Sequence, residues 1–280
     1  MSFEANIKSH PDFVIYLRTE RNYQIPGMKP HYLFAFIWLL LLSFLPLHAA
    51  ESPDTTPLRI AVTPNFPPMI YKENGKLVGA EVDFAEALGA ELGRPIKLVE
   101  VSWEDQIPDL TDGRTDIIMS SMSITQPRSL RVSFSKPYLS VGQTVLVRRE
   151  DANKYLLGFP VRPEGTIGVI KATTGDFLVQ QEFSGTKRKQ FKTPEDAANA
   201  LIKKKIDLFV SDLPLVWWLS SMHESDGLVS LQLFLTEERL GWAVRKSDTK
   251  LLDSVNTALD KLQKDGRAST ILKHWLPLYK

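Results

Sequence analysis

Hydroxyl, guanidinium and carboxylate side chains follow several apolar segments of this 280-residue chain, each at the point where we expect a strand to end. Ser121, Ser123 and Arg128 follow one such segment, and Thr173-Thr174 and Asp212 follow two others. The planar guanidinium of an arginine can bind a carboxylate through two parallel hydrogen bonds. An aspartate can accept hydrogen bonds from an ammonium. The set therefore predicts a site for a small zwitterion, which carries both groups.

Two aromatic side chains and one expected helix start belong to the same set. Phe66 follows the first expected strand and Trp103 follows the second. The turn at Thr173-Thr174 would add backbone N–H groups and the positive end of a helix dipole, which favour an anion. Taken alone, Thr173 and Asp212 would be ordinary helix N-caps. Phe66, Trp103 and Arg128 alone would be ordinary core or surface residues, so the prediction rests on the combination.

The expected elements around these residues alternate between strand and helix, in two successive units. The first unit has strands at 58–62, 96–101 and 115–119 and helices at 80–92 and 103–110. The second unit has strands at 166–170, 189–191 and 206–210 and helices at 175–183 and 194–204. This order is typical of parallel sheets covered by helices, which bind ligands beyond the carboxyl ends of their strands. Two such units predict two lobes.

The segments that join and follow the two units predict a hinge. Residues 143–148 and 241–245 alternate like strands, and the apolar residues of 251–262 are spaced like those of a helix face. Because the last segment follows the second unit, we expect it to return to the first lobe, so that two chain crossings join the lobes. Lobe 1 would then comprise residues 57–140 and 240–280, and lobe 2 residues 141–239.

The first fifty residues differ from the rest of the chain. Residues 32–47 form a continuous apolar run that follows Lys29 and precedes Ala49-Ala50, which is typical of a secretory signal peptide. The alternative to a signal peptide is an uncleaved membrane anchor. The run is shorter than the ~20 residues that span a bilayer comfortably, which favours the signal peptide. We expect residues 1–50 to be an N-terminal extension and signal peptide, with Met28 as the start, and the mature protein to be periplasmic.

Composition excludes several classes of site. The chain has no cysteine, which rules out disulfides, thiolate metal sites, cysteine nucleophiles and a lipid anchor on cysteine. Acidic and basic residues balance after residue 50, so the domain lacks the basic surface of a nucleic-acid-binding protein. The five histidines are scattered, and no phosphate-binding loop or nucleophile elbow occurs. We therefore expect no metal, no cofactor and no enzymatic activity.

The segment 121–128, SMSITQPR, resembles the polar amino-acid-binding proteins of bacterial ABC importers, solute-binding family 3. The pattern S-x-S-I-T-x-x-R after a strand is fairly specific. Further similar segments extend over residues 58–276, among them LRIAV, GKLVGAEVDFAEALGAELG, IPDLTDGRTDII, FSKPY and GVIKATTGDF. The resemblance implies a type II periplasmic-binding-protein fold: two α/β lobes, each a mainly parallel sheet flanked by helices, with a ligand cleft between them and a two-crossing hinge.

The resemblance also implies a role for each candidate residue. By position, Arg128 would hold the α-carboxylate of an amino acid, helped by Ser123 and by Thr173-Thr174. Ser121 and Asp212 would hold its α-ammonium. The protein would then capture a small amino acid or related zwitterion by hinge closure, and a monomer would deliver it to the membrane subunits of an ABC importer.

The aromatic residues and three departures from the family pattern bear on the ligand side chain. Phe66 and Trp103 would flank it. Thr63 stands where several relatives selective for basic ligands carry an acid, which argues against lysine or arginine. Ala172 replaces a usual glycine before the threonine pair, and Gly175 stands where a longer polar residue often contributes.

Two alternatives share the fold. Related domains act as sensor or regulatory binding modules, which would need a separate partner here to carry the signal. Others resemble cyclohexadienyl dehydratases, which work through a carboxylic acid in the cleft. An Asp212 paired with an ammonium would be ionised and therefore a poor proton donor. The sequence thus favours binding without catalysis.

Overall fold

The computed structural model describes residues 56–155, 165–183, 185–231 and 233–277. The expected signal peptide and the expected start at Met28 lie outside these ranges. Within the ranges, no helix combines the length and the apolar character that crossing a membrane requires.

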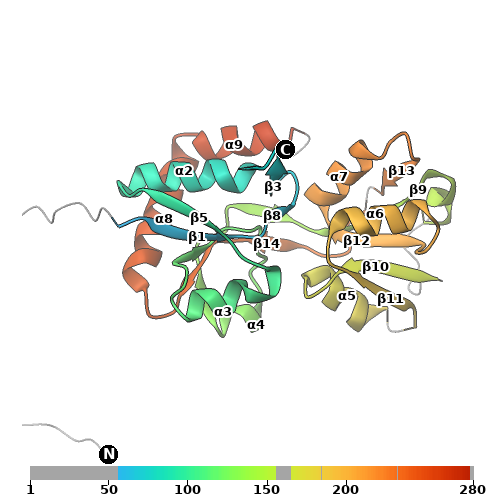
Figure 1. Ribbon diagram of the computed structural model, residues 1–280, viewed down its shortest axis with the longest axis horizontal. Coiled ribbons are helices and arrows are strands. Elements are labelled where there is room, and N and C mark those ends of the chain that lie inside the picture. The colour runs from blue at the N-terminus through green and yellow to red at the C-terminus, as the bar shows by residue number, and fades with distance from the viewer. Residues whose placement is uncertain (1–55, 156–164, 184, 232, 278–280) are drawn as a thin grey trace, which may run out of the picture. The chain divides into compact units, whose positions relative to one another are not determined.

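Lobe 1 is built on a five-stranded sheet with the order β5-β1-β6-β15-β7, of which Figure 1 labels β5 and β1. Its strands are β1 (Leu58–Val62), β5 (Ile96–Glu100), β6 (Ile117–Ile118), β7 (Val132–Phe134) and β15 (Ala243–Arg245). The first three in chain order are parallel, whereas β15 pairs antiparallel with both β6 and β7. The predicted strand at 115–119 contracts to β6, because only Ile117 and Ile118 pair with both neighbours.

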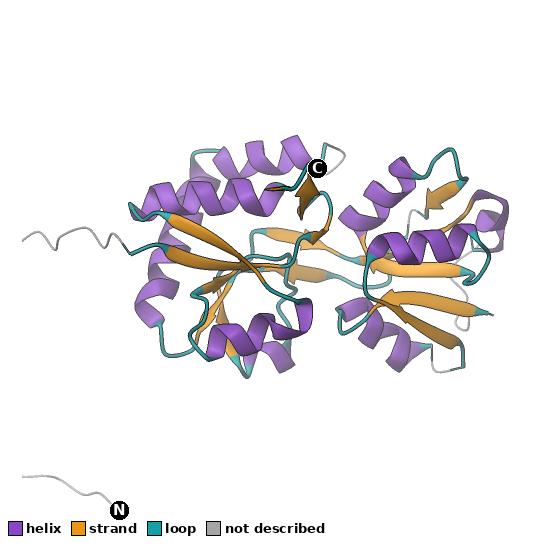
Figure 2. Ribbon diagram, viewed as in Figure 1, coloured by secondary structure: helices purple, strands orange, loops and turns teal. Residues whose placement is uncertain are grey.

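Helices cover both faces of this sheet (Figure 2). One face carries α2 (Ala80–Leu92), α8 (Thr249–Lys264) and α9 (Arg267–Trp275), and the other carries η1 (Trp103–Asp105), α3 (Gln106–Thr111) and α4 (Gln126–Ser129). Strand residues alternate between the two faces: Ile60 packs in the core under α2 and α8, and Ala61 in the core under α3. A separate small sheet joins β2 (Asn65–Phe66), β3 (Ile70–Glu73) and β4 (Lys76–Val78).

Lobe 2 repeats the plan with the sheet order β11-β10-β12-β9-β13. Its strands are β9 (Gln143–Arg148), β10 (Thr166–Ile170), β11 (Lys187–Phe191), β12 (Leu208–Asp212) and β13 (Leu228–Ser230). Its helices are η2 (Arg149–Lys154), α5 (Thr174–Glu182), α6 (Pro194–Ile202) and α7 (Leu213–Met222). Thr193 is the N-cap of α6, since its hydroxyl accepts from the Asp196 N–H at 3.2 Å, and Pro194 opens the helix.

Two short strands connect the lobes. β8 (Leu139–Val141) leads into β9 of lobe 2, β14 (Glu238–Leu240) leads into β15 of lobe 1, and the two pair antiparallel. The C-terminal helices α8 and α9 then pack on α2, where Val255 and Leu259 share a core with Phe84 and Leu88. The predicted two-lobed α/β fold is confirmed, and adjacent chain crossings of this kind can act as a hinge.

Candidate functional site

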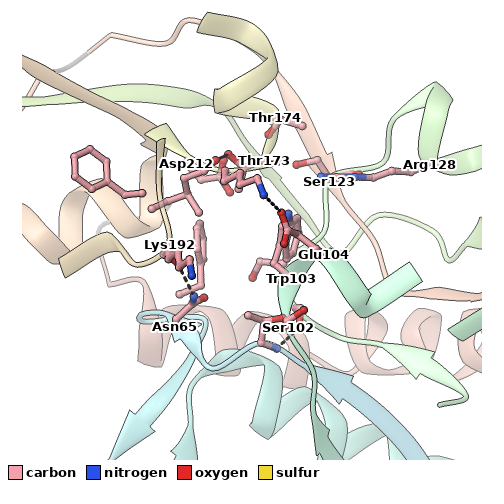
Figure 3. A pocket seen from close by; sticks show the side chains of 17 residues that line it. Asn65, Ser102, Trp103, Glu104, Ser123, Arg128, Thr173, Thr174, Lys192 and Asp212 are labelled. Atoms are coloured by element: carbon pink, nitrogen blue, oxygen red, sulfur yellow. Dashed lines mark hydrogen bonds and ion pairs between the residues drawn. The ribbon is translucent and has the colours of Figure 1, made fainter. Parts of the chain in front are cut away.

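A cavity of about 310 Å³ lies between the lobes, at the low end of the range typical of small-molecule sites. All eight residues singled out from the sequence line it: Phe66, Trp103, Ser121, Ser123, Arg128, Thr173, Thr174 and Asp212. The remaining lining residues are Thr63, Asn65, Ser102, Glu104, Ser120, Ile170, Lys171, Phe191 and Lys192. In Figure 3, Asp212, Thr173 and Thr174 lie on one side of the cavity and Asn65 and Ser102 on the opposite side.

Arg128 reaches the cavity from α4 of lobe 1. The helix begins at its N-cap Thr125, whose hydroxyl accepts from the Arg128 backbone N–H at 3.4 Å. Nη1 of Arg128 donates to the carbonyl oxygen of Ser123 at 2.9 Å, and the guanidinium carbon lies 5.3 Å from the ring centre of Trp103. No other guanidinium N–H of Arg128 has a hydrogen-bond partner in the described part of the chain. Most of its planar fork is therefore left for a ligand carboxylate.

Asp212 reaches the cavity from lobe 2. It is the last residue of β12 and the N-cap position of α7, but its side chain makes no capping hydrogen bond. Its Oδ1 instead accepts a short hydrogen bond from Nε2 of Gln143, the first residue of β9. The ordinary N-cap explanation of Asp212 therefore does not account for its side chain, which is buried at the wall of the cavity.

Burial raises the pKa of the Asp212 carboxyl from 3.8 to about 7, and the negative charge of Glu238 adds to the rise. The Gln143 hydrogen bond and the positive charge of Arg128 act in the opposite direction. Near pH 7, the protonated and the ionised forms of Asp212 are therefore both populated in the empty molecule. The ionised Asp212 expected from the sequence is the form paired with an ammonium, which the empty cavity does not contain. A bound ammonium would lower this pKa again and favour the carboxylate.

The backbone of Ser121 is hydrogen-bonded to a buried glutamate, Glu81, which the sequence analysis did not identify. Oε1 of Glu81 accepts from the Ser121 backbone N–H at 2.5 Å and from the Tyr138 hydroxyl at 2.6 Å. Oε2 accepts from the indole N–H of Trp242 at 3.1 Å. Ser121 has a φ of +53°, in the left-handed region that non-glycine residues rarely adopt. Glu81 therefore stabilises an otherwise unfavourable backbone at the cavity wall.

Ser123 contacts both Glu238 and Arg128 in the empty cavity. Its hydroxyl oxygen lies 2.5 Å from Oε2 of Glu238, and its carbonyl oxygen accepts from Arg128. An ionised carboxylate can only accept, so the serine donates its hydroxyl proton to Glu238. That proton is then not free for a ligand carboxylate. The lone pairs of the hydroxyl instead suit an ammonium.

Thr173 and Thr174 form the start of α5. The Thr173 hydroxyl donates to the Ile170 carbonyl at 2.7 Å and accepts from the Asp176 N–H at 3.4 Å, so Thr173 does cap the helix. Ala172 adopts a φ of +62°, and its N–H donates to the buried Asp176 carboxylate at 2.9 Å. The first N–H groups of a helix lack intrahelical partners. The cap and the anion-binding interpretations of this turn are therefore compatible.

Polar contacts join the lobes at the cavity, among them one from Nδ2 of Asn65 to the carbonyl oxygen of Lys192 at 3.4 Å. The indole N–H of Trp103 donates to the carbonyl of Ala172 at 3.0 Å. Beside it, Nζ of Lys171 lies 2.6 Å from Oε1 of Glu104. Trp103 and Glu104 belong to lobe 1, whereas Lys171 and Ala172 belong to lobe 2. These contacts require the two lobes to lie close together at the cavity, which we describe as a closed arrangement.

Gln143 explains the small residue at position 175. A Cβ on Gly175 would lie only 2.6 Å from Oε1 of Gln143. The amide of Gln143 also donates to Oγ1 of Thr174 at 3.1 Å. Gln143 thus occupies the space beside the turn into which a longer side chain at position 175 would extend.

The family model for bacterial extracellular solute-binding proteins, family 3, matches residues 58–277. The chain is 28% identical over 257 residues to the L-arginine-binding protein of Pseudomonas aeruginosa, covering 87% of this chain and 95% of that protein. It is 25% identical over 219 residues to the L-cystine-binding protein TcyJ of Escherichia coli K12, covering 78% of this chain and 82% of that protein.

A solved structure with a similar fold is that of AncCDT-1, an ancestral amino acid-binding protein described as a precursor of cyclohexadienyl dehydratase. It is 31% identical with a TM-score of 0.71, covering 78% of this chain and 94% of that chain. These findings confirm the resemblance seen at residues 121–128. The chain belongs to the bacterial extracellular solute-binding proteins, family 3.

Proposed function

We propose that this protein captures a small amino acid in the cavity between its lobes, outside the cytoplasm, and delivers it to an ABC importer. One observation carries the proposal. A guanidinium with unused N–H groups, that of Arg128, and a buried carboxylate, that of Asp212, line one cavity from different lobes. These groups complement the two poles of an α-amino acid. The names of the arginine-binding and cystine-binding relatives support the same ligand class.

Hinge closure is the proposed mechanism, with lobe 1 at 57–140 and 240–280 and lobe 2 at 141–239. A ligand carboxylate would first meet Arg128 on lobe 1. The start of α5 and Asp212 would then reach the ligand from lobe 2 as the lobes close. Ligand interactions made only in the closed form set the population shift, and about 5.5 kcal/mol moves an equilibrium from 1:99 to 99:1. The Trp103–Ala172 and Glu104–Lys171 contacts favour the closed form in addition.

The proposed partners follow from this mechanism. The membrane subunits of an importer would distinguish the closed form from the open one, and the protein would act as a periplasmic monomer. Export through a signal peptide within residues 1–50 is part of the same proposal.

A thermal-shift screen tests the ligand class. The standard amino acids, L-cystine, dipeptides and organic acids without an amine would be compared. A ligand at 100 times its Kd stabilises by about 2.7 kcal/mol, which is roughly 5–10 °C for a domain of this size. Uncharged side chains should give larger shifts than lysine or arginine, because Glu104 is already paired with Lys171 and Thr63 is not acidic. If amine-free acids alone raised the melting temperature, the proposal would be wrong.

The Gly175→Ala variant tests the proposed role of Gln143 beside the cavity. The added methyl should displace Gln143 and weaken binding of the best ligand from the screen by about tenfold, with no loss of helix stability. Titration calorimetry would measure the affinity. Gly185→Ala is the matched control, because a Cβ there meets no atom within 4 Å. Equal affinities of both variants and the wild type would contradict this role.

A dehydratase activity is the second candidate, favoured by one observation. With its pKa raised to about 7 by burial and by Glu238, Asp212 could donate a proton near neutral pH. AncCDT-1 is described as a precursor of such an enzyme. Incubation with prephenate or arogenate tests this candidate. Turnover that disappears in Asp212→Asn would support the enzyme, and binding without turnover would support the capture function.

A further inference from the structure

We propose that Glu238 and Gln143, neither of which lines the cavity, are positioning residues that hold Ser123 and Asp212 as hydrogen-bond acceptors for the ligand's ammonium. This inference rests on the proposed function and deepens it, since it assigns the ammonium pole of the site to two residues outside the cavity wall. Both lie where the chain crosses between the lobes, Glu238 on β14 and Gln143 at the start of β9.

Glu238 fixes the direction of the Ser123 hydroxyl. The 2.5 Å distance between Ser123 Oγ and Glu238 Oε2 is that of a strong charge-assisted hydrogen bond. The backbone keeps the two residues in register, because Ile124 N–H donates to the Arg239 carbonyl at 2.8 Å and Ser123 forms a bridge with Leu240. With its proton donated to Glu238, Ser123 presents only lone pairs to the cavity.

Gln143 links the two carboxylates. Its Nε2 donates to Oδ1 of Asp212 and, with its two hydrogens serving three acceptors, also lies 3.1 Å from Oε1 of Glu238 and 3.1 Å from Oγ1 of Thr174. Its own Oε1 is buried and has no hydrogen-bond partner among the described residues. The amide is therefore oriented by the two acids, since the reverse orientation would place its oxygen against both carboxylates. An N–H group lies between two negative groups that would otherwise repel each other directly.

The arrangement favours an ammonium over a hydroxyl. Asp212 and Ser123 both offer acceptor atoms, and an ammonium has three N–H donors where a hydroxyl has one. The negative charge of Glu238 lies within hydrogen-bond distance of the Ser123 hydroxyl and further favours a cation there. An amino acid should therefore bind far better than the 2-hydroxy acid of the same side chain.

The pH dependence of binding reports on this network. Binding an ammonium requires ionised Asp212, so affinity should fall as the pH drops below about 7. The groups that act on Asp212 are Glu238 from β14, Gln143 from β9 and Arg128 from α4, with Tyr138 also close. Besides burial, Glu238 raises the pKa of Asp212, and Gln143 lowers it. Removing either residue should therefore move the midpoint of the pH profile, in opposite directions.

The test is calorimetry from pH 5.5 to 8.5 with the amino acid that shifts the wild-type melting temperature most. Glu238→Gln should bind about tenfold more weakly at pH 8.5, with a midpoint at lower pH than the wild type. Gln143→Met should also bind more weakly, with a midpoint at higher pH. Glu237→Gln is the control, because Glu237 is exposed and directly precedes Glu238 in the chain. Circular dichroism would establish that each variant is folded.

Two outcomes would overturn the inference. The first is a Glu238→Gln variant that binds with wild-type affinity. The second is weaker binding by both variants with midpoints of their pH profiles that stay unchanged or move in the same direction, which would indicate a general loss of structure at the site. The Gln143→Met profile decides alone if Glu238→Gln does not fold. If the wild type binds no amino acid in the screen, the proposed function fails and this inference fails with it. If the wild type binds and the variants match it, only this inference fails.

Discussion

Replacing Arg128 by alanine should weaken amino-acid binding by at least about 100-fold and leave the fold intact. In the proposed site the guanidinium is the main carboxylate-binding group, and truncating it removes several charge-assisted hydrogen bonds to the ligand. Folding should survive, because the side chain makes a single internal hydrogen bond, to the Ser123 carbonyl, and its helix has only four residues. Titration calorimetry and thermal melting would measure the two effects.

Two further variants sharpen this test. Arg128→Lys keeps the charge but loses the planar fork, so its affinity should fall between those of the wild type and of Arg128→Ala. Arg131→Ala removes an exposed arginine three residues later and should bind like the wild type. An unchanged affinity of Arg128→Ala would rule out Arg128 as the carboxylate anchor.

Replacing Asp212 by asparagine should abolish amino-acid binding and at the same time stabilise the empty protein at pH 8. The pKa of Asp212 is raised from 3.8 to about 7 by burial and by Glu238. Because the pKa of Asp212 is higher in the folded than in the unfolded state, protonated Asp212 contributes to the free energy of unfolding. This contribution is fully present below the unfolded-state pKa of about 4 and is lost as the pH rises through about 7. At pH 8 the buried carboxylate costs a few kcal/mol. Asparagine resembles the protonated form and avoids this cost.

The pH dependence makes the second prediction specific. The melting temperature of Asp212→Asn should exceed that of the wild type by several degrees at pH 8 and by much less at pH 5, where Asp212 is protonated. Asp253→Asn, on the exposed side of α8, should melt like the wild type at both pH values. A variant that melts lower than the wild type at pH 8 would contradict the account of Asp212.

The helices and strands whose apolar residues repeat at a regular spacing, or which end at a residue such as glycine, could be predicted from the sequence. The helix at 80–92 has the predicted bounds, because its apolar residues repeat at helical spacing and Gly93 ends it in a left-handed conformation. The strands at 58–62, 143–148 and 166–170 also agree with the structure. By contrast, β8 and β14 have only three residues each and carry no period, so the strands of the hinge could not be found.

The candidate wall residues could be predicted, but the residues that orient them could not. Phe66, Arg128 and Asp212 follow strand ends, where any parallel sheet exposes ligand-binding side chains. Glu81 looked like an ordinary acid in the first turn of a helix, whereas it is fully buried beneath Ser121, 40 residues away. The partners Ser123 and Glu238 are separated by 115 residues. Contacts of this kind leave no local pattern in a single sequence.

The pKa of Asp212 was missed for the same reason. It depends on burial in the cavity wall and on Glu238, which lies near Asp212 only once the two crossings are paired. The size of Gly175 was the one local signal of this network, since it leaves room for Gln143.

The most direct test of the account is a calorimetric comparison of one amino acid with two derivatives that each block one pole. For the best ligand of the screen, the α-carboxamide removes the carboxylate and the N-acetyl derivative removes the ammonium. We expect each derivative to bind at least about 100-fold more weakly than the parent amino acid, because Arg128 and Asp212 each lose a charged partner. If either derivative bound with the affinity of the parent amino acid, the proposal that Arg128 binds the carboxylate and Asp212 binds the ammonium of one ligand would be contradicted.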